Sequence, residues 1–268
     1  NDNLLNGLNP EDLKSANDST SNVFTLTCLE NPVTIKLTNI DDLTLEYTLG
    51  EIKFSKLPAK QIQLMPGDSI YLRGKNKSLS EYSTTKFVVS GSGKLICSGD
   101  IMSLLDGFKD SRISDFAPYA FAHLFEDCTQ LIIAPNLPPY LTVGCYESMF
   151  KGCINLTNTP DLPATTLTDY CYKSMFEGCM SLTTMPKLAA TTLTKGCYES
   201  MFEGCTNIKQ MPKLAATQLT ENCYSRMFKG CVNLEGEVEL QAVPLEFGCY
   251  NEMFDGCPKI NFIRAMFI

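Results

Sequence analysis

The chain has 268 residues, 44% of them hydrophobic and 19% charged, which is enough to bury a core in one large or two modest globular units. Its formal net charge of −8 at pH 7 argues against a nucleic-acid partner, because binding to phosphates requires a basic surface. It argues equally against a polybasic membrane-binding patch. No run of about 18 apolar residues occurs, so the sequence predicts no transmembrane helix.

The first residues are polar. Asn, Asp, Ser and Thr dominate the end of residues 1–21, which we expect to form a disordered leader. The chain begins at Asn1 rather than at Met, so we expect that a targeting segment has been removed, with lipid anchoring through that segment as one possibility.

Short runs of alternating hydrophobicity follow from residue 22 to residue 98. Examples are VFTLTCL, VTIKL and SIYLRG, and turn signals such as Pro66-Gly67-Asp68 separate them. Seven or eight short strands at this spacing predict an all-β sandwich domain.

The second half of the chain is an internal repeat. Five copies of the pattern CYxxMFxGC begin at Cys145, Cys171, Cys197, Cys223 and Cys249, each 26 residues after the last. A degenerate first copy, AFAHLFEDC, ends at Cys128. Residues 99–268 are therefore predicted to form a solenoid of six repeats of 25–26 residues, preceded by a helical cap.

The repeated pattern is predicted to be a short helix. At about 100° per residue, the two Cys, the Tyr, the Met and the Phe fall on one arc that would face the core. Opposite charges lie at i,i+4 in two copies, Glu147 with Lys151 and Lys173 with Glu177. The Gly before the second Cys would end the helix in a left-handed conformation.

A short strand is predicted after each helix. Leu or Ile follows the second Cys at the third position, and Pro recurs at the seventh position in Pro135, Pro160, Pro186 and Pro212. Because Pro cannot donate to a strand ladder, we expect it at the end of the strand or at a bulge. The predicted fold class is therefore α+β in two domains, an N-terminal all-β sandwich followed by a leucine-rich-repeat solenoid of short helices and short strands.

The repeat unit CYxSMFxGCxxLTxxPxLPATTL resembles the BspA-like leucine-rich-repeat surface proteins of bacteria, and GDIMSLLDG ahead of the first copy resembles the solenoid entry of that family. The resemblance covers about residues 99–268. It implies a secreted or cell-surface protein, or an outer-membrane lipoprotein, that acts in adhesion. It implies no catalytic residues.

Ten of the thirteen cysteines recur in the five full repeats. Three interpretations are open: a ladder of buried thiols, disulfides, or zinc ligands. The helix geometry places these cysteines beyond the roughly 7 Å that a disulfide allows between Cα atoms. C-x7-C is no zinc spacing. We therefore favour free thiols and expect neither a metal nor a cofactor.

The one histidine, His123, is expected at the surface, and a single His does not favour Ser-His-Asp or Cys-His catalysis. The recurring tyrosines are expected in the core, with a ligand-stacking platform as the alternative.

Polar residues that vary beside the recurring Leu indicate a binding surface. The candidate residues are Asn158, Asp161, Thr184, Lys187, Gln210, Lys213 and Glu239. Stacked repeats would place them in rows that suit an extracellular protein or polysaccharide. We expect a non-enzymatic surface interaction or adhesion protein that binds through this face. The alternative is a glycan-binding accessory component of a surface uptake system, with its ligand site on the β-sandwich.

Overall fold

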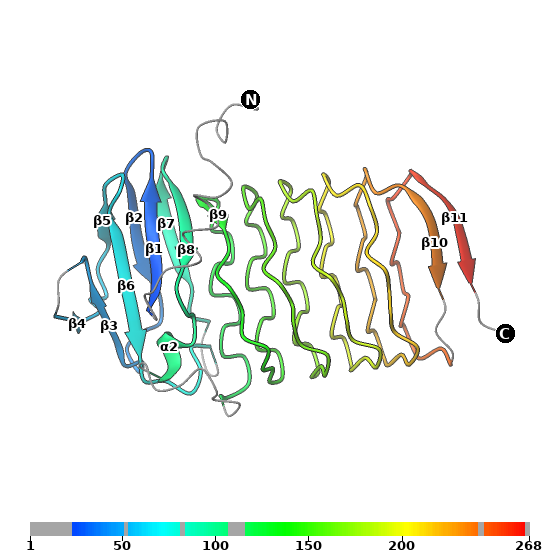
Figure 1. Cartoon of the computed structure of the whole chain (residues 1–268), viewed down its shortest axis with the longest axis horizontal. Coiled ribbons are helices and arrows are strands. Elements are labelled where there is room, and N and C mark those ends of the chain that lie inside the picture. The colour runs from blue at the N-terminus through cyan, green and yellow to red at the C-terminus, as the bar shows by residue number, and fades with distance from the viewer. Residues whose placement is uncertain (1–22, 51–52, 81–83, 107–115, 241–243, 266–268) are drawn as a thin grey trace.

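The computed structural model describes residues 23–50, 53–80, 84–106, 116–240 and 244–265. The predicted leader, residues 1–21, lies outside the described residues. The molecule is elongated, with a strand-rich N-terminal part at one end and a stack of coils leading to the other (Figure 1). No helix among the described residues is long and apolar enough to cross a membrane.

The N-terminal part contains two sheets. One has the order β4-β3-β6-β1-β8-β9, and the other has the order β5-β2-β7. The strands are β1 (Phe24–Leu29), β2 (Val33–Leu37), β3 (Leu45–Thr48), β4 (Ser55–Lys56), β5 (Ile62–Leu64), β6 (Ser69–Gly74), β7 (Phe87–Gly91), β8 (Lys94–Ser98) and β9 (Leu131–Ile133). Alternate residues of β6 are buried, as expected of a strand with one face on a core. The rings of Phe24 in β1 and Phe87 in β7 lie 6.3 Å apart and join the two sheets.

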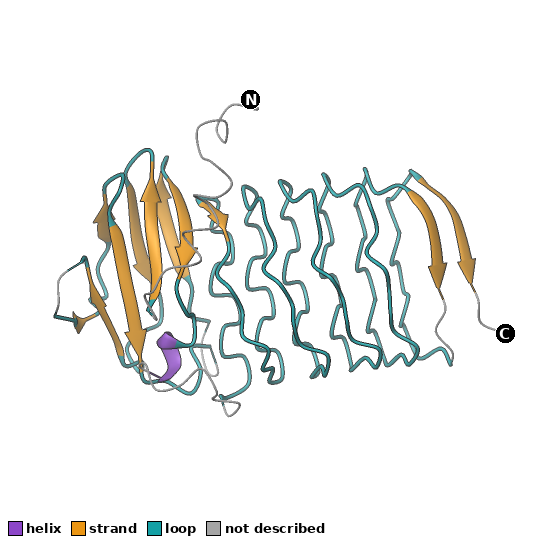
Figure 2. Cartoon of the chain, viewed as in Figure 1, coloured by secondary structure: helices purple, strands orange, loops and turns teal. Residues whose placement is uncertain are grey.

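The described residues contain one helix, α2 (Ser103–Asp106), which is a single turn (Figure 2). Ser103 holds it against the first sheet, because its Oγ accepts from the N–H of Phe24 at 2.8 Å and donates to the carbonyl of Leu72 at 3.1 Å. Residues 107–115, which include part of the predicted helical cap, lie outside the described residues.

The predicted α+β fold class is wrong, because the part of the chain that the structure describes is nearly all β and contains no helical solenoid. The nine-residue CYxxMFxGC segment, here named the turn segment, is a series of tight turns in every repeat. In the second copy the N–H groups of Met149 and Lys151 bond to carbonyls three residues back, whereas those of Ser148 and Phe150 bond to carbonyls of the next repeat. In a helix, the N–H groups from Met149 onward would bond to carbonyls four residues back, within the same segment.

Sequence composition and packing both explain this outcome. Cys, Tyr, Ser, Phe and Gly are weak helix formers, and nine residues are too few for a helix that is stable alone. Every fourth residue from the one that precedes the turn segment is left-handed, with φ of 60° at Gly144, 53° at Ser148 and 73° at Gly152. The turn segment therefore repeats its backbone every four residues. Each 26-residue repeat, named a coil from here on, bonds through this segment to the coils on either side.

Replacement of Gly178 by Ala should lower the free energy of unfolding by about 1–2 kcal/mol, because an L-residue is strained at φ of +73°. An added Cβ would lie 3.8 Å from Gly152, which is an ordinary contact, so the cost comes from the backbone alone. The loss in free energy of unfolding is measured by urea denaturation, monitored by circular dichroism. Thr183→Ala on the exposed surface should change stability by less than about 0.5 kcal/mol. A Gly178→Ala protein with an unchanged free energy of unfolding would contradict the left-handed conformation of this residue.

Short strands form only where proline permits them. Pro160, Pro186 and Pro212 occupy the seventh position after the second Cys, and no strand is assigned around them. In the last two coils Val238 and Arg264 replace Pro, and β10 (Gly236–Leu240) pairs in parallel with β11 (Ile260–Ala265). The predicted strand in every repeat is therefore wrong for the middle repeats, since Pro lacks the N–H that a ladder needs.

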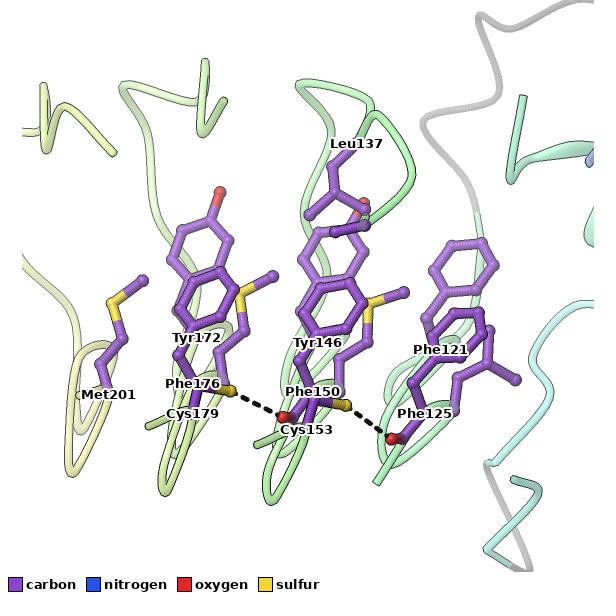
Figure 3. Packing of buried hydrophobic residues seen from close by; sticks show 14 of the residues in the cluster. Phe121, Phe125, Leu137, Tyr146, Phe150, Cys153, Tyr172, Phe176, Cys179 and Met201 are labelled. Carbon is purple, nitrogen blue, oxygen red and sulfur yellow. Dashed lines mark hydrogen bonds between the residues drawn. The ribbon is translucent and has the colours of Figure 1, made fainter. Parts of the chain in front are cut away.

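The solenoid core consists of stacked identical side chains (Figure 3). One row of rings begins at Phe121 and continues through the five repeat tyrosines, with centroids 5.8–6.0 Å apart. A second row begins at Phe125 and continues through the repeat phenylalanines at 5.5–5.9 Å. Met and Cys side chains fill the space beside them.

The first coil also packs on the N-terminal part. The ring of Phe125 stacks on Phe87 at 5.1 Å, and β8 pairs in parallel with β9. The N–H groups of Leu79 and Phe87 bond to the carbonyls of Ala120 and Leu124, as one coil bonds to the next. The core is consequently continuous from the strands into the coils.

Candidate interaction surface

The segments that follow the turn segments present the predicted binding residues on one side of the solenoid, which we name the rung side. Asp161, Thr184, Lys187, Gln210, Lys213 and Glu239 are all exposed. Buried leucines stand between them, such as Leu162 and Leu188. The rung side thus alternates core and surface residues in each coil, and stacking places equivalent residues of successive coils in rows.

Asn158 differs from the other predicted residues because it is half-buried. Its Oδ1 accepts a hydrogen bond from the N–H of Ala134 in the previous coil at 3.3 Å. This side chain therefore holds two coils together, and the sequence pattern did not distinguish such a contact from a surface position.

The charges on the rung side are incompletely compensated. At the eighth position after the second Cys the order is Asp161, Lys187, Lys213 and Glu239. Glu239 lies 3.8 Å from Arg264. Lys187, Lys213 and the exposed Lys209 form no ion pair with any residue in the described part of the chain. These lysines leave a small basic area on an otherwise acidic protein.

The turn segments carry charges that are paired with one another from coil to coil. Lys151 lies 2.9 Å from Glu177, and Lys173 lies 3.9 Å from Glu147 and 3.8 Å from Glu199. The pairs expected within single helices are replaced by pairs between neighbouring coils. Such partly exposed pairs stabilise little individually, but they neutralise this side of the solenoid.

All thirteen cysteines are free and buried. The second Cys of five repeats donates its S–H to the carbonyl of the Phe one coil earlier, as Cys153 does to Phe125 and Cys179 does to Phe150, both at 3.0 Å (Figure 3). Burial raises the pKa of Cys145 to about 12, so this thiol is protonated at neutral pH. No cluster of metal-ligating side chains occurs in the ranges that the structure describes.

The tyrosines are core residues rather than a ligand platform. Tyr146, Tyr172 and Tyr224 are at most 1% exposed, and each stacks between neighbouring rings. His123 is partly exposed and lies 3.2 Å from Glu126. It has φ of 62° at the position that Ser148 takes in the next coil.

The comparisons with known proteins found no matching family model, no matching curated protein and no matching solved structure. The resemblance to BspA-like proteins therefore stays an expectation drawn from the repeat pattern.

Two features of the surface were missed by the sequence analysis. Leu79 and Phe87 cover the first coil, and no copy of the repeat around them revealed this contact. At the opposite end, Phe262 and Ile263 in β11 are 52% and 47% exposed. The apolar run INFI in the last repeat was the available signal.

Proposed function

We propose that the protein is a non-enzymatic interaction module, secreted or attached to a cell surface, that binds an extracellular protein or polysaccharide through the rung side. The observation that carries the proposal is the contrast between the two sides of the coils. Charges on the turn segments are paired between coils, whereas Lys187, Lys209 and Lys213 stand exposed without an ion pair in the described residues. An extended row of this kind suits a long partner better than a small molecule, which needs a concave pocket.

Charge reversal at two of these lysines tests the proposal. Glycan and matrix-protein arrays probed with the full chain would first supply a ligand. The double variant Lys187→Glu, Lys213→Glu should then raise the dissociation constant by about tenfold or more, because two attractive contacts become repulsive. The melting temperature should stay unchanged, since neither lysine takes part in an ion pair with the described residues.

A matched control is Lys36→Glu with Lys60→Glu, which makes the same change of charge on exposed positions of the N-terminal part. Binding that is unaffected by the rung-side variant would contradict the proposal. Binding that only the control variant weakens would favour the second candidate function.

That second candidate is a glycan-binding accessory component of a surface uptake system, with the site on the N-terminal strands. A shallow depression there favours it. Its lining residues are Ile40, Asp41, Leu43, Leu45, Lys56, Leu57, Pro58 and Ala59. Apolar walls with an Asp and a Lys could hold one sugar ring, but the depression contains no aromatic side chain on which a sugar would stack.

A further inference from the structure

The outer face of the last described coil repeats the chemistry by which the coils bind each other. In the preceding coil the N–H groups of Arg226, Phe228 and Gly230 donate to carbonyls of the following coil at 2.7–3.1 Å. The equivalent N–H groups of Glu252, Phe254 and Gly256 meet no carbonyl among the described residues. The backbone is otherwise the same, with φ of 51° at Glu252 and 75° at Gly256. This face therefore presents a row of unused donors.

The same face is apolar. Among the described residues, Tyr250 and Phe254 are the last rings of the two rows and are half-buried, whereas their counterparts Tyr224 and Phe228 are buried. In β11, Phe262 and Ile263 are about half exposed. Within the described residues β11 pairs only with β10, so its other edge is open, at the end of the molecule far from the N-terminal sheets (Figure 1).

The other end of the solenoid shows how such a face is covered. The N–H groups of Leu79 and Phe87 donate to carbonyls of the first coil, and the ring of Phe87 stacks on Phe125. A segment that is not a repeat thus supplies both the backbone bonds and the ring that a preceding coil would give. Solenoids generally need such a cover at each end.

We propose that this C-terminal face, formed by the turn segment of the last coil and by β11, binds a partner polypeptide that adds one coil in parallel register. The partner places carbonyl oxygens against the N–H groups of Glu252, Phe254 and Gly256, aromatic or apolar side chains on Phe254, and a strand along β11. The interface between the last two described coils has this composition, with backbone bonds, stacked rings and the β10-β11 pairing, so the site continues an interface that the structure already contains. Addition of a strand to an open edge is a common mode of peptide recognition.

The direction of the donors argues against a two-fold pair of this chain. A head-to-tail copy is disfavoured as well, because the N–H groups of Leu79 and Phe87 already bond to the first-coil carbonyls that such a copy would offer. Each turn segment gives carbonyls to the coil before it and N–H groups to the coil after it. A two-fold axis that brought two last turn segments together would set N–H groups against N–H groups, and these would lose their water without gaining acceptors. A parallel coil satisfies all of them.

The probe is a reduced synthetic peptide with the sequence of residues 222–247, which contains one coil, and its scrambled form is the negative control. Binding to the full chain is measured by fluorescence anisotropy with a labelled peptide. We expect saturable 1:1 binding. Ile263→Lys should weaken it by at least about tenfold, because a charge on the edge opposes strand addition. Circular dichroism checks that this exposed substitution leaves the fold intact.

Val88→Lys is the matched control, because Val88 is 44% exposed on β7 at the other end of the molecule. It should bind the peptide as the unmodified chain does. Absence of binding, or equal binding to the Ile263→Lys variant, would overturn the proposal. Light scattering that found dimers of the unmodified chain and monomers of Ile263→Lys would instead identify a second copy as the occupant, and would overturn it too.

Discussion

Raising the pH above 9 should destabilise this protein steeply, because the folded state buries thiols that ionise once the chain unfolds. Burial raises the pKa of Cys128, Cys145 and Cys231 from 9.0 to about 12. It also raises the pKa of Cys97 and Cys153 well above 9.0. Desolvation is the main cause in each case, since a thiolate in an apolar core has lost its water.

The sign of the effect follows from proton counting. Below pH 9 these thiols are protonated in both states, and their contribution to stability is fully present. Above pH 9 the unfolded chain loses protons that the folded chain keeps, so each buried thiol lowers the free energy of unfolding by up to about 1.4 kcal/mol per pH unit. Five such thiols together lower the free energy of unfolding by up to about 7 kcal/mol per pH unit, which is comparable to the whole stability of about 5–15 kcal/mol of a folded protein.

The measurement is the urea midpoint, followed by circular dichroism under reducing conditions at about pH 7.5, 8.5 and 9.5, a window that spans the onset of thiol ionisation in the unfolded chain. We expect little change over the first interval and a large fall over the second. The double variant Cys179→Ala, Cys205→Ala should be less stable than the unmodified chain at every pH. Its urea midpoint should nevertheless fall less between pH 8.5 and pH 9.5 than that of the unmodified chain, because it has two fewer buried thiols. A midpoint independent of pH would show that the thiols reach solvent in the folded state.

The burial pattern of the turn segment was predictable, although its conformation was not. In the four segments that begin at Cys145, Cys171, Cys197 and Cys223, the buried apolar residues lie at positions 0, 1, 4, 5 and 8. On a helix of period 3.6 these positions share one arc, and with the observed period of four they share two adjacent faces. The two periods cannot be separated over nine residues. Ser148, at position 3, is buried as well, which the helical prediction did not foresee. The left-handed backbone of Ser148 is incompatible with an α-helix, and the residue type alone did not indicate it.

The exposed positions of the rung side were predictable from sequence, but the contacts between neighbouring coils were not. Variable polar residues beside a constant Leu do mark exposed positions, as Lys187 and Lys213 show. Asn158 is the exception, because its polar side chain forms a hydrogen bond between two coils. Pairing between Lys151 and Glu177 was likewise beyond reach, since it requires the register of one coil on the next. Sequence spacing within a single repeat holds no information on that register.

Replacement of Phe125 by Ala should both destabilise the protein and separate its two parts. The side chain is fully buried, and its ring contacts Phe24 at 6.2 Å, Phe87 at 5.1 Å and Phe150 at 5.7 Å. Removal of such a buried ring lowers the free energy of unfolding by about 3–5 kcal/mol. Two of the three neighbours belong to the N-terminal strands and one to the second coil, so the cavity would lie at the junction of the two.

Phe202→Ala is the matched control. Phe202 is as deeply buried and stacks on Phe176 at 5.5 Å and Phe228 at 5.9 Å, but all three residues belong to the coils. Both variants should lose a similar amount of stability. Hydrogen exchange followed by mass spectrometry should distinguish them, because in Phe125→Ala the strands β1–β8 and the coils after Cys145 should open with different free energies. In the unmodified chain and in Phe202→Ala, β8 and the first coil should open together, since β8 pairs with β9 and Phe87 stacks on Phe125. If β8 and the first coil of the unmodified chain already exchange independently, the continuous core does not couple the two parts.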